Sequence, residues 1–361
     1  MSNLMTGTTQ YSLLEIKYGN FIVPAVKIKS FGSDLVSKNS LTVIDLIVTL
    51  SLDSASMAVI KIADAYDVEK HCFDKKTKGL FKLGTILEIE IGYLSATTAV
   101  FKGYVAGLGV EIEEEGSPLL VVKLMDARKL MMTTGVRKQL YADKNYSDIF
   151  KKVMGRYAKL CGIEADATSD KLTSPVSQST NDYNFVKNEL LKKGKSEREF
   201  FVLYDKAYFR KPCKNKTPIM TVDFGRELLR LSTMADYLDS EIEVIGYDPK
   251  NTKSVSAKQK VKGTQNNTPV LTPTPQQFFI DPDADSAEKV KIRAGSIAEK
   301  MKRNSFYAEG ELIGLPEIVP GRYLKVEKVD ELADKSYYLS EVTHHISESL
   351  FKTMFEAKGC L

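Results

Sequence analysis

The sequence predicts an α+β protein that is mainly β, with two similar small antiparallel β-barrels joined by an α/β middle domain. Three observations predict this class. Apolar residues recur with a period of two towards both ends of the chain, they recur with a helical period in the middle, and similar strand segments follow in the same order at the two ends. We expect a first barrel domain over 1–132, a middle domain over 133–236 and a second barrel domain over 237–361.

Length and composition limit the class of protein. A chain of 361 residues exceeds the ~100–150 residues of a typical domain, so two or three domains are expected. The net charge of +4 is small for this length and gives no argument for specific nucleic-acid binding. No apolar run reaches the ~20 residues of a membrane span, and the start, "MSNLMTGTTQ", lacks the regions of a secretory signal. We therefore expect synthesis and folding in the cytoplasm.

The first domain is predicted from alternating strands. In "LTVIDLIVTLSL" the even positions from Ile44 to Leu52 are all apolar. "GTILEIEIGY" repeats this alternation, with Leu87, Ile89 and Ile91 on one side and Glu88 and Glu90 on the other. "AVFKGYVAGLGVEI" and "PLLVVKLMDA" follow, separated by a hairpin connection. Several short strands with turn residues between them are typical of a small barrel or sandwich.

The middle domain is predicted from two helices and a strand pair. "SDIFKKVMGRYAKLCG" has an apolar stripe at helical spacing, with Ser147 as a candidate N-cap and Gly162 as its left-handed end. "NDYNFVKNELLKKG" predicts a second helix that Asp182 caps and Gly194 ends. "FFVLYDKAYFRKP" then alternates as a strand pair that turns at Asp205 and Lys206.

The last domain begins with the strand "SEIEVIGYDP". The tract at about 250–280 is poor in apolar residues, and we expect a long polar loop there. A helix capped by Ser286 is predicted at about 284–303. The strands "FYAEGELIG", "GRYLKVEKV", "KSYYLSEVTHHIS" and "FKTMFEAKG" complete the chain.

The two β-rich ends are similar in the order of their strands. Each has a strand that opens with glycine, then a second strand, then a strand that ends in an acid and an alanine, either Asp126-Ala127 or Glu356-Ala357. The polar positions of the two glycine-led strands are candidates for contacts between β units. These candidate interface residues are Glu88, Glu90, Tyr323, Lys325 and Glu327.

No catalytic, metal or cofactor site is predicted. The four cysteines have no CxxC spacing, and of three histidines only His71 adjoins a cysteine, Cys72. Glu189, Glu197, Glu199 and Asp205 lie in a charged stretch, but nothing in their spacing holds two carboxylates apart across a cleft. We expect these charges to keep a scaffold helix soluble and oriented, and we expect no enzyme activity.

The segments above resemble the late control D family, the hub proteins of contractile phage tails and related injection machines, including the hub portion of VgrG proteins. "FKLGTILEIEIGY" with "VFKGYVAGL" is similar to the glycine-led strand and F-x-G-Y strand of that family, and "LMDARKLM" to the aspartate that closes its first barrel. "YADKNYSDIFKKVMGRYA", "NDYNFVKNELLKKG", "IEVIGYDP", "LPEIVPGRYLKV" and "YYLSEVTH" resemble later segments in the same order. The likeness extends over some 340 residues.

This resemblance implies a structural hub in the baseplate of a contractile tail or injection system. It implies a homotrimer in which three chains present six similar units, so that a hexameric tail tube can meet a trimeric spike. Because the sequence ends at Leu361, without the needle that follows in VgrG proteins, a separate spike protein is expected. Tail tube, baseplate wedge and tape-measure or effector proteins are the other expected partners. The particle could be an infectious phage, a phage-tail-like bacteriocin or another injection device.

Two alternatives stay open at this point. The chain could be a tail-associated enzyme that degrades the cell wall, or a carrier module that binds an effector or the tape-measure protein, with the polar tract 250–278 as its contact segment.

Overall fold

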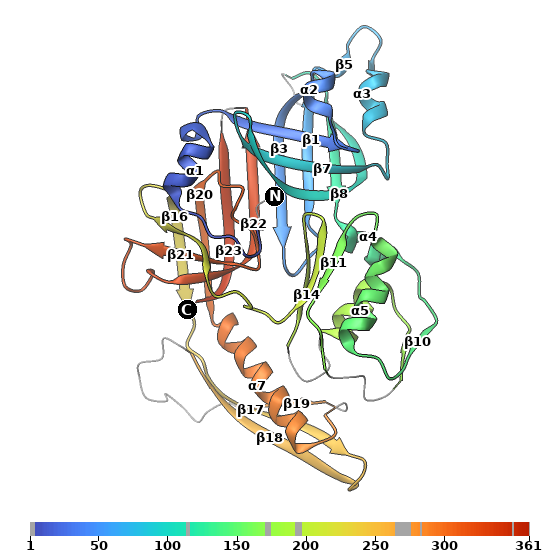
Figure 1. Ribbon diagram of the computed structural model, residues 1–361, viewed down its shortest axis with the longest axis vertical. Coiled ribbons are helices and arrows are strands. Elements are labelled where there is room, and N and C mark those ends of the chain that lie inside the picture. Colours follow the sequence, from blue (N-terminus) through green and yellow to red (C-terminus); the bar gives the residue numbers. More distant parts are fainter. Residues whose placement is uncertain are drawn as a thin grey trace.

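A computed structural model describes residues 4–112, 116–169, 175–191, 197–263, 276–281, 284–348 and 350–360. Its largest element is one sheet of 13 strands among the described residues, with the order β16-β20-β23-β22-β3-β4-β9-β8-β7-β1-β2 and with β21 and β15 branching from β22. Figure 1 shows strands from the two ends of the chain side by side at the centre of the molecule. The sheet therefore unites both β-rich ends.

The first β unit comes from the N-terminal third of the chain. Its six main strands are β1 (Pro24–Ser30), β3 (Thr42–Ser51), β4 (Met57–Ala63), β7 (Ile86–Tyr93), β8 (Ala96–Glu111) and β9 (Leu119–Met125). Around them lie α1 (Tyr11–Lys17), η1 (Gly19–Phe21), β2 (Ser33–Asp34), α2 (Leu35–Asn39), β5 (Tyr66–Asp67), β6 (Cys72–Phe73) and α3 (Lys75–Leu80). The predicted alternation is confirmed, since Leu87, Ile89 and Ile91 are all buried. The helix α1 falls in a region for which only strands were predicted.

The second β unit is discontinuous in sequence. Its six strands are β15 (Pro218–Asp223), β16 (Leu228–Ala235), β20 (Phe306–Ile313), β21 (Tyr323–Glu327), β22 (Ser336–Ser347) and β23 (Phe351–Cys360). We predicted β15 and β16 to lie in the middle domain, but β15 pairs with β21 and β16 with β20.

The two β units have the same strand order. Pairing runs β1-β7-β8-β9-β4-β3 in the first and β15-β21-β22-β23-β20-β16 in the second, so strands that occupy equal places also follow in equal order along the chain. Register shifts recur at equal places too, at Val105/Gly107 and Leu339/Glu341, and at Val43/Asp45 and Leu228/Arg230. One difference is that β1 pairs antiparallel with β7, whereas β15 pairs parallel with β21.

Two closed barrels are not confirmed. No pairing joins the outer strands β1 and β3 within the described residues, and β3 instead pairs antiparallel with β22 of the second unit. The two units also share one hydrophobic core, in which the rings of Tyr93 and Phe351 lie 5.3 Å apart. Strand alternation defines which face of a strand is buried, but it does not define the strand that pairs with each edge.

The register also corrects one predicted equivalence. Glu356 lies opposite Glu341, as Lys123 lies opposite Gly107, so Glu356 takes the place of Lys123 and not of Asp126. Asp126 instead follows β9 and caps the next helix.

The middle unit packs helices on a small sheet around a core of its own. Its elements are α4 (Ala127–Thr133), β10 (Gln139–Tyr141), α5 (Tyr146–Met154), η2 (Gly155–Tyr157), β11 (Gly162–Ala165), β12 (Val176–Gln178), α6 (Asp182–Phe185), η3 (Val186–Leu190), β13 (Glu199–Leu203) and β14 (Lys206–Arg210). The predicted hairpin is confirmed as β13 and β14, which pair antiparallel.

Three predicted helix ends in the middle unit are wrong by a few residues. The helix that we expected Ser147 to cap has its N-cap at Asn145, and the Ser147 hydroxyl accepts a bond from the Thr168 amide instead. Gly162 opens β11 and does not end a helix. The N-cap of α6 is Asn181, whose side chain accepts from the Asn184 amide at 2.8 Å, while Asp182 is already helical. Gly194 lies outside the described residues.

A small α/β module is inserted between β16 and β20 and lies at the lower end of Figure 1. It consists of β17 (Asp239–Asp248), β18 (Lys253–Lys262), β19 (Gln276–Ile280) and α7 (Ala287–Asn304). The predicted Ser286 cap is confirmed, because its side chain accepts from the Lys289 amide. The predicted loop is wrong over Lys253–Lys262, which pairs with β17 along its length, and over Gln276–Ile280, which pairs with β17 on its other side. The first of these strands escaped prediction because few of its inward residues, such as Val261, are large and apolar; the tract 264–275 lies outside the described residues.

Candidate interaction surfaces

The charged stretch after residue 181 forms internal ion pairs. Glu199 accepts from Arg210 Nε at 2.8 Å and from the Tyr338 hydroxyl at 2.8 Å. Arg210 also donates to the Gly321 carbonyl at 2.6 Å. This network joins the β13–β14 hairpin to β22 and to the loop before β21 of the second unit, so these charges hold the middle unit against the sheet.

A second link uses a neighbouring glutamate. Both carboxylate oxygens of Glu197 accept from Arg303 Nη2 at 2.6 Å, which connects the chain just before β13 to the last turn of α7. Of the other two acids considered from sequence, Glu189 is half-buried on η3 and Asp205 lies in the turn of the hairpin. Glu197 and Glu199 thus lie close together at the start of β13, each held by its own arginine, while Glu189 and Asp205 lie on other elements.

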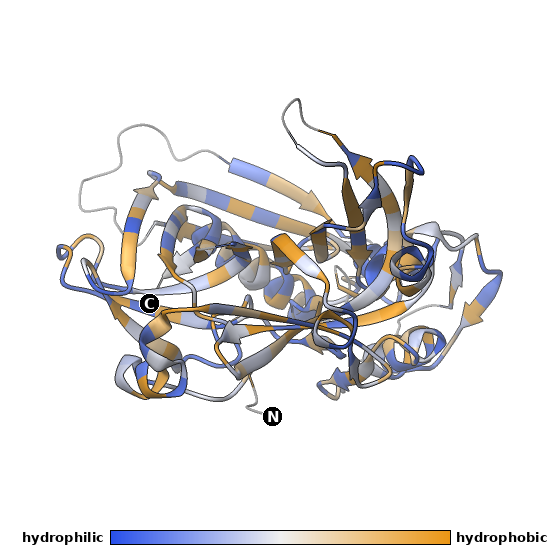
Figure 2. Cartoon of the chain, turned by 90° about the horizontal axis from the view of Figure 1, so that it is seen from above, coloured by the Kyte–Doolittle hydropathy of each residue, from blue (hydrophilic) through white to orange (hydrophobic). Residues whose placement is uncertain are grey.

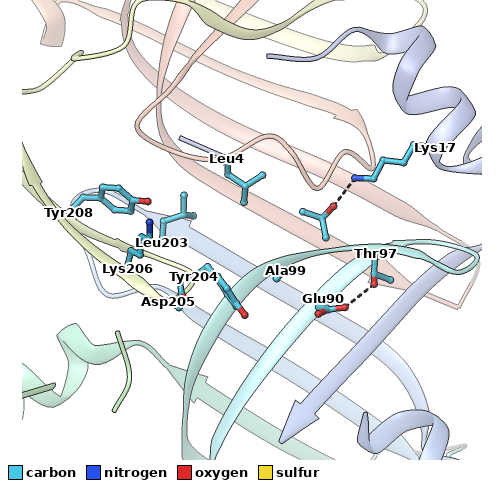
Figure 3. Close-up of a pocket in the computed structure, with 11 residues that line it drawn as sticks. Leu4, Lys17, Glu90, Thr97, Ala99, Leu203, Tyr204, Asp205, Lys206 and Tyr208 are labelled. Atoms are coloured by element: carbon cyan, nitrogen blue, oxygen red, sulfur yellow. Dashed lines mark hydrogen bonds between the residues drawn. The ribbon is translucent and has the colours of Figure 1, made fainter. Parts of the chain in front are cut away.

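A cavity of about 630 Å³ lies between β7 and β8 of the first unit and the β13–β14 hairpin. Figure 3 shows Tyr204 and Asp205 on one side and Glu90 and Thr97 on the other. Glu90 accepts from Thr97 at 2.9 Å and pairs with Lys29. Burial acts to raise the pKa of Glu90, but the bonds from Lys29 and Thr97 outweigh it, and the pKa lies below its ordinary value. The carboxylate is therefore held charged by its neighbours.

The wall next to this cavity joins the N-terminal helix to both β units. Lys17 Nζ, at the end of α1, donates to the Thr98 hydroxyl at 2.9 Å, to the Tyr18 hydroxyl at 2.8 Å and to Glu317 Oε1 at 2.7 Å. These three bonds use the three protons of the ammonium group. They connect α1 to β8 and to the loop before β21. The cavity therefore lies where elements of both β units meet.

The predicted interface residues occupy equivalent places in the two units. Lys102 of β8 and Ser336 of β22 occupy equivalent positions. Glu88 lies opposite Lys102 and Lys325 lies opposite Ser336, so Glu88 is equivalent to Lys325 and Glu90 to Glu327. Glu88 accepts from the Tyr204 hydroxyl at 3.1 Å, while Lys325 and Glu327 pair with each other at 2.5 Å. Tyr323 is buried, its ring 5.1 Å from that of Tyr338.

The structure does not bring the two predicted sets together. Glu90 lines the cavity beside the hairpin, whereas Lys325 lines a separate cavity beneath α1. Burial and the carboxylate of Glu88 raise the pKa of Tyr204 well above its ordinary value, which keeps its hydroxyl a hydrogen-bond donor. Glu88, Glu90 and Tyr323 thus have partners within the chain, and their role between chains stays a prediction.

Sequence reasoning missed two strand edges. At β16 and at the far end of β8, apolar residues are exposed beside backbone that pairs on one side only in the described part of the chain. The observation that could have indicated them is the near absence of charge in "LLRLSTMA" and "AGLGVEI".

The described residues were also compared with what a metal site and a membrane span require. Within the described ranges, no three His, Cys, Asp or Glu side chains are grouped as a metal would require. In the same ranges, no helix is both long and apolar enough to cross a membrane.

The fold recurs in proteins of tails and secretion systems. A tail protein of Neisseria meningitidis has a TM-score of 0.67 at 12% identity, over 93% of this chain and 96% of that one. The 43 kDa tail protein of prophage MuSo2 from Shewanella oneidensis has a TM-score of 0.65 at 10% identity, over 92% and 98%. A component of the E. coli type VI secretion system has a TM-score of 0.54 at 11% identity, over 92% of this chain and 76% of that one. These likenesses show a shared fold.

The sequence itself matches one family. Residues 22–348 match the family described as the Alg8 N-terminal domain, and the chain belongs to this family. No curated protein matches the sequence.

Proposed function

We propose that this chain is a structural protein of a phage tail or a related contractile injection system, and that it forms the central hub of the baseplate. The observation that carries the proposal is the end-to-end likeness to two tail proteins, which covers more than nine-tenths of this chain and of each of those chains. A fold shared over the whole length of both chains argues for a shared architectural role more than a shared single module would.

The hub would be a ring of three copies. Each chain carries two β units with one strand order, so three chains would present six similar units around an axis. Such a ring could meet a hexameric tail tube on one face and a separate trimeric spike on the other. Baseplate wedge proteins and a tape-measure protein or effector would be its further partners.

The role would be architectural, without catalysis by this chain. Glu197 and Glu199, the acids nearest to a catalytic pattern in sequence, are held by Arg303 and Arg210 and connect one unit to another. Incubation of the purified chain with peptidoglycan should release no soluble fragments. Release that disappears in Glu197→Gln or Glu199→Gln would favour the cell-wall enzyme instead.

The ring itself is tested by mass. Native mass spectrometry of the full chain across a concentration series should give a species of three times the 40.3 kDa chain mass. Co-expression with the tube and spike proteins of the same particle should yield a complex that contains all three. A chain that stays monomeric at every concentration and binds neither partner would overturn the proposal.

A further inference from the structure

The junction between the two β units within the chain has an unfilled counterpart at the outer edges of the molecule. Inside the chain, β3 of the first unit pairs with the second half of β22 of the second unit. By strand order, β16 is the equivalent of β3, and β8 is the equivalent of β22. Yet β16 beyond Leu228 pairs only with β20, and β8 beyond Val105 pairs only with β9, in the ranges that the structure describes.

We propose that β16 of one copy pairs antiparallel with the β8 segment 106–112 of a second copy, and thereby repeats between chains the β3–β22 junction found within each chain. This inference rests on the proposed function, whose ring it explains. The contact joins two different edges, so it is heterologous and can close a ring. Figure 1 shows β16 on the left and β8 on the right of the β22–β3 junction, as a head-to-tail contact requires.

Exposure supports this pairing. Val342, His344 and Ile346, in the part of β22 that pairs with β3, are exposed by 0%, 0% and 6%. Their equivalents by register in β8 are Leu108, Val110 and Ile112, exposed by 41%, 57% and 71%. The three places are thus buried where the sheet continues into another strand, and exposed where the sheet ends within the described residues.

The two edges differ in charge from the edge strands β18 and β1, while the short edge strand β19 of the inserted module is uncharged as they nearly are. Exposed edges are ordinarily protected from pairing by lysine or proline. The edge strand β18 carries four exposed lysines, and β1 carries Pro24 and two lysines and packs against α2. By contrast β16 carries one charge, Arg230, and segment 106–112 carries one, Glu111. The two are of opposite sign, which disfavours pairing of like edges, although Glu111 already pairs with Lys61 within the chain.

The internal junction supplies the register. There His344 lies opposite Val48, Thr343 opposite Thr49, and His345 Nε2 lies 2.7 Å from Asp45 Oδ1. Transferred to the equivalent residues, Val110 lies opposite Thr233, and Gly109 opposite Met234. Glu111 then takes the place of His345 and Arg230 that of Asp45, so an acid and a base again meet at this point.

This register fits the side chains present. Met234, exposed by 64%, would lie across from a glycine that leaves space for it. About six residue pairs at roughly 3.3 Å each give a ladder of about 20 Å.

The test blocks one edge at a time in the full-length chain. Val110→Lys blocks the β8 edge and Thr233→Lys blocks the β16 edge, because either places an uncompensated charge inside the junction. Each variant alone should be monomeric, with the dissociation constant raised by about a hundredfold or more. The control Val68→Lys, at an exposed site beyond β5, should assemble as the unchanged chain does.

Mixing gives the decisive result. Each blocked variant keeps one intact edge, so an equal mixture of the two should form a 1:1 dimer that grows no further, which also shows that both are folded. Self-association of Val110→Lys together with a monomeric Thr233→Lys would indicate β16–β16 pairing and overturn the inference. Unchanged trimers of both variants would overturn the inference and leave the proposed hub standing, whereas a monomeric parent chain would overturn both.

A cysteine pair tests the register. Val110→Cys and Thr233→Cys, introduced in one chain, should form a disulfide between copies under mild oxidation, since directly opposite strand residues lie ~4.5–5.5 Å apart. Val110→Cys with Leu231→Cys, displaced by two residues along the same face, should cross-link far less. Equal cross-linking of both pairs would overturn the register.

Discussion

The guanidinium of Arg128 lies 2.9 Å from the carboxylate of Asp126, and neither side chain is more than 1% exposed. Asp126 also accepts from the Ser56 amide and caps α4, while Arg128 donates to the Ser51 carbonyl and the Ser56 hydroxyl, each at 2.9 Å. The pair thus ties the end of β9 to the β3–β4 turn, at the boundary between the first β unit and the middle unit.

Removal of one member of this pair should be strongly destabilising. Arg128→Met leaves the Asp126 carboxylate buried without its partner, and the free energy of unfolding should fall by about 3–5 kcal/mol. Urea unfolding followed by circular dichroism measures the loss. Lys358→Met, which breaks an exposed pair with Asp53, is the control and should cost less than about 1 kcal/mol. Equal losses in the two variants would contradict the role given to Arg128.

His344 should make stability depend on pH in the acid range. Its ring is completely buried, with Nδ1 3.0 Å from the Thr353 hydroxyl, and burial lowers its pKa to about 3. The unfolded chain keeps the ordinary pKa of about 6.5, so below that pH the unfolded state binds a proton that the folded state does not. Stability should fall as pH falls from about 6.5, by up to about 1.4 kcal/mol per pH unit.

The measurement is the unfolding free energy at pH 7, 6 and 5. His344→Gln should be less stable at pH 7 but should show a shallower slope than the parent chain. His71→Gln, at an exposed position, should leave the slope unchanged. The assignment of this pH dependence to His344 fails if both variants keep the parent slope.

Three glutamates lie side by side across three strands. Glu356 of β23 is directly opposite Glu309 of β20 and Glu341 of β22. Burial and these two carboxylates raise the pKa of Glu356. A raised pKa in the folded state means that the stabilising contribution is present at low pH and is lost as pH rises through the folded pKa.

Glu356→Gln should therefore stabilise the chain at neutral pH. We expect a gain of about 0.2–1 kcal/mol at pH 7, the usual size of a cross-strand pair, and a smaller gain at pH 4. Chemical denaturation at the two pH values measures it. Glu311→Gln on the same sheet loses the ion pair with Lys352 and should bring no gain; a gain there equal to that of Glu356→Gln would point to net charge rather than to this row.

Gly310 should not tolerate a side chain. A Cβ at this position would lie 2.5 Å from Phe355 Cζ and 2.9 Å from the Arg230 carbonyl oxygen. Gly310→Ala should cost about 1–3 kcal/mol of stability through overpacking. Gly295→Ala, in the open middle of α7, should instead stabilise by about 0.4–1 kcal/mol because alanine restricts the unfolded chain. Thermal unfolding compares the two, and a neutral Gly310→Ala would show that Phe355 can move away.

Much of the local structure could be predicted because it depends on neighbours in sequence. The buried side of β7 is indicated by Leu87, Ile89 and Ile91, and the start of α7 by Ser286. The caps of α5 and α6 were misplaced because each helix has two good candidates close together. These are Asn145 and Ser147 for α5, and Asn181 and Asp182 for α6, and long-range contacts decide between them. Asp182 is buried as the acceptor for Tyr157 and Arg156, which short-range reasoning could not foresee.

The candidate surfaces were predicted less well. The similar order of the glycine-led strands was predicted, and the register of the strands then makes Glu88 equivalent to Lys325. The edges of β16 and β8 depend on which strands remain without a second neighbour, and that is a property of the whole sheet.

The sequence by itself determined the strand and helix periods, the inward faces of the strands and the similarity of the two ends, because alternation of apolar residues acts within each segment. Tertiary structure alone decided that the two units share one sheet through β3 and β22, that the charges of β13 and β14 serve as links between units, and that β16 and the end of β8 are edges within the described residues. The physical reason is that strand pairing and side-chain hydrogen bonds join residues up to some 300 positions apart, as Asp45 and His345 are joined. The pattern along one segment holds no record of the partner at that distance.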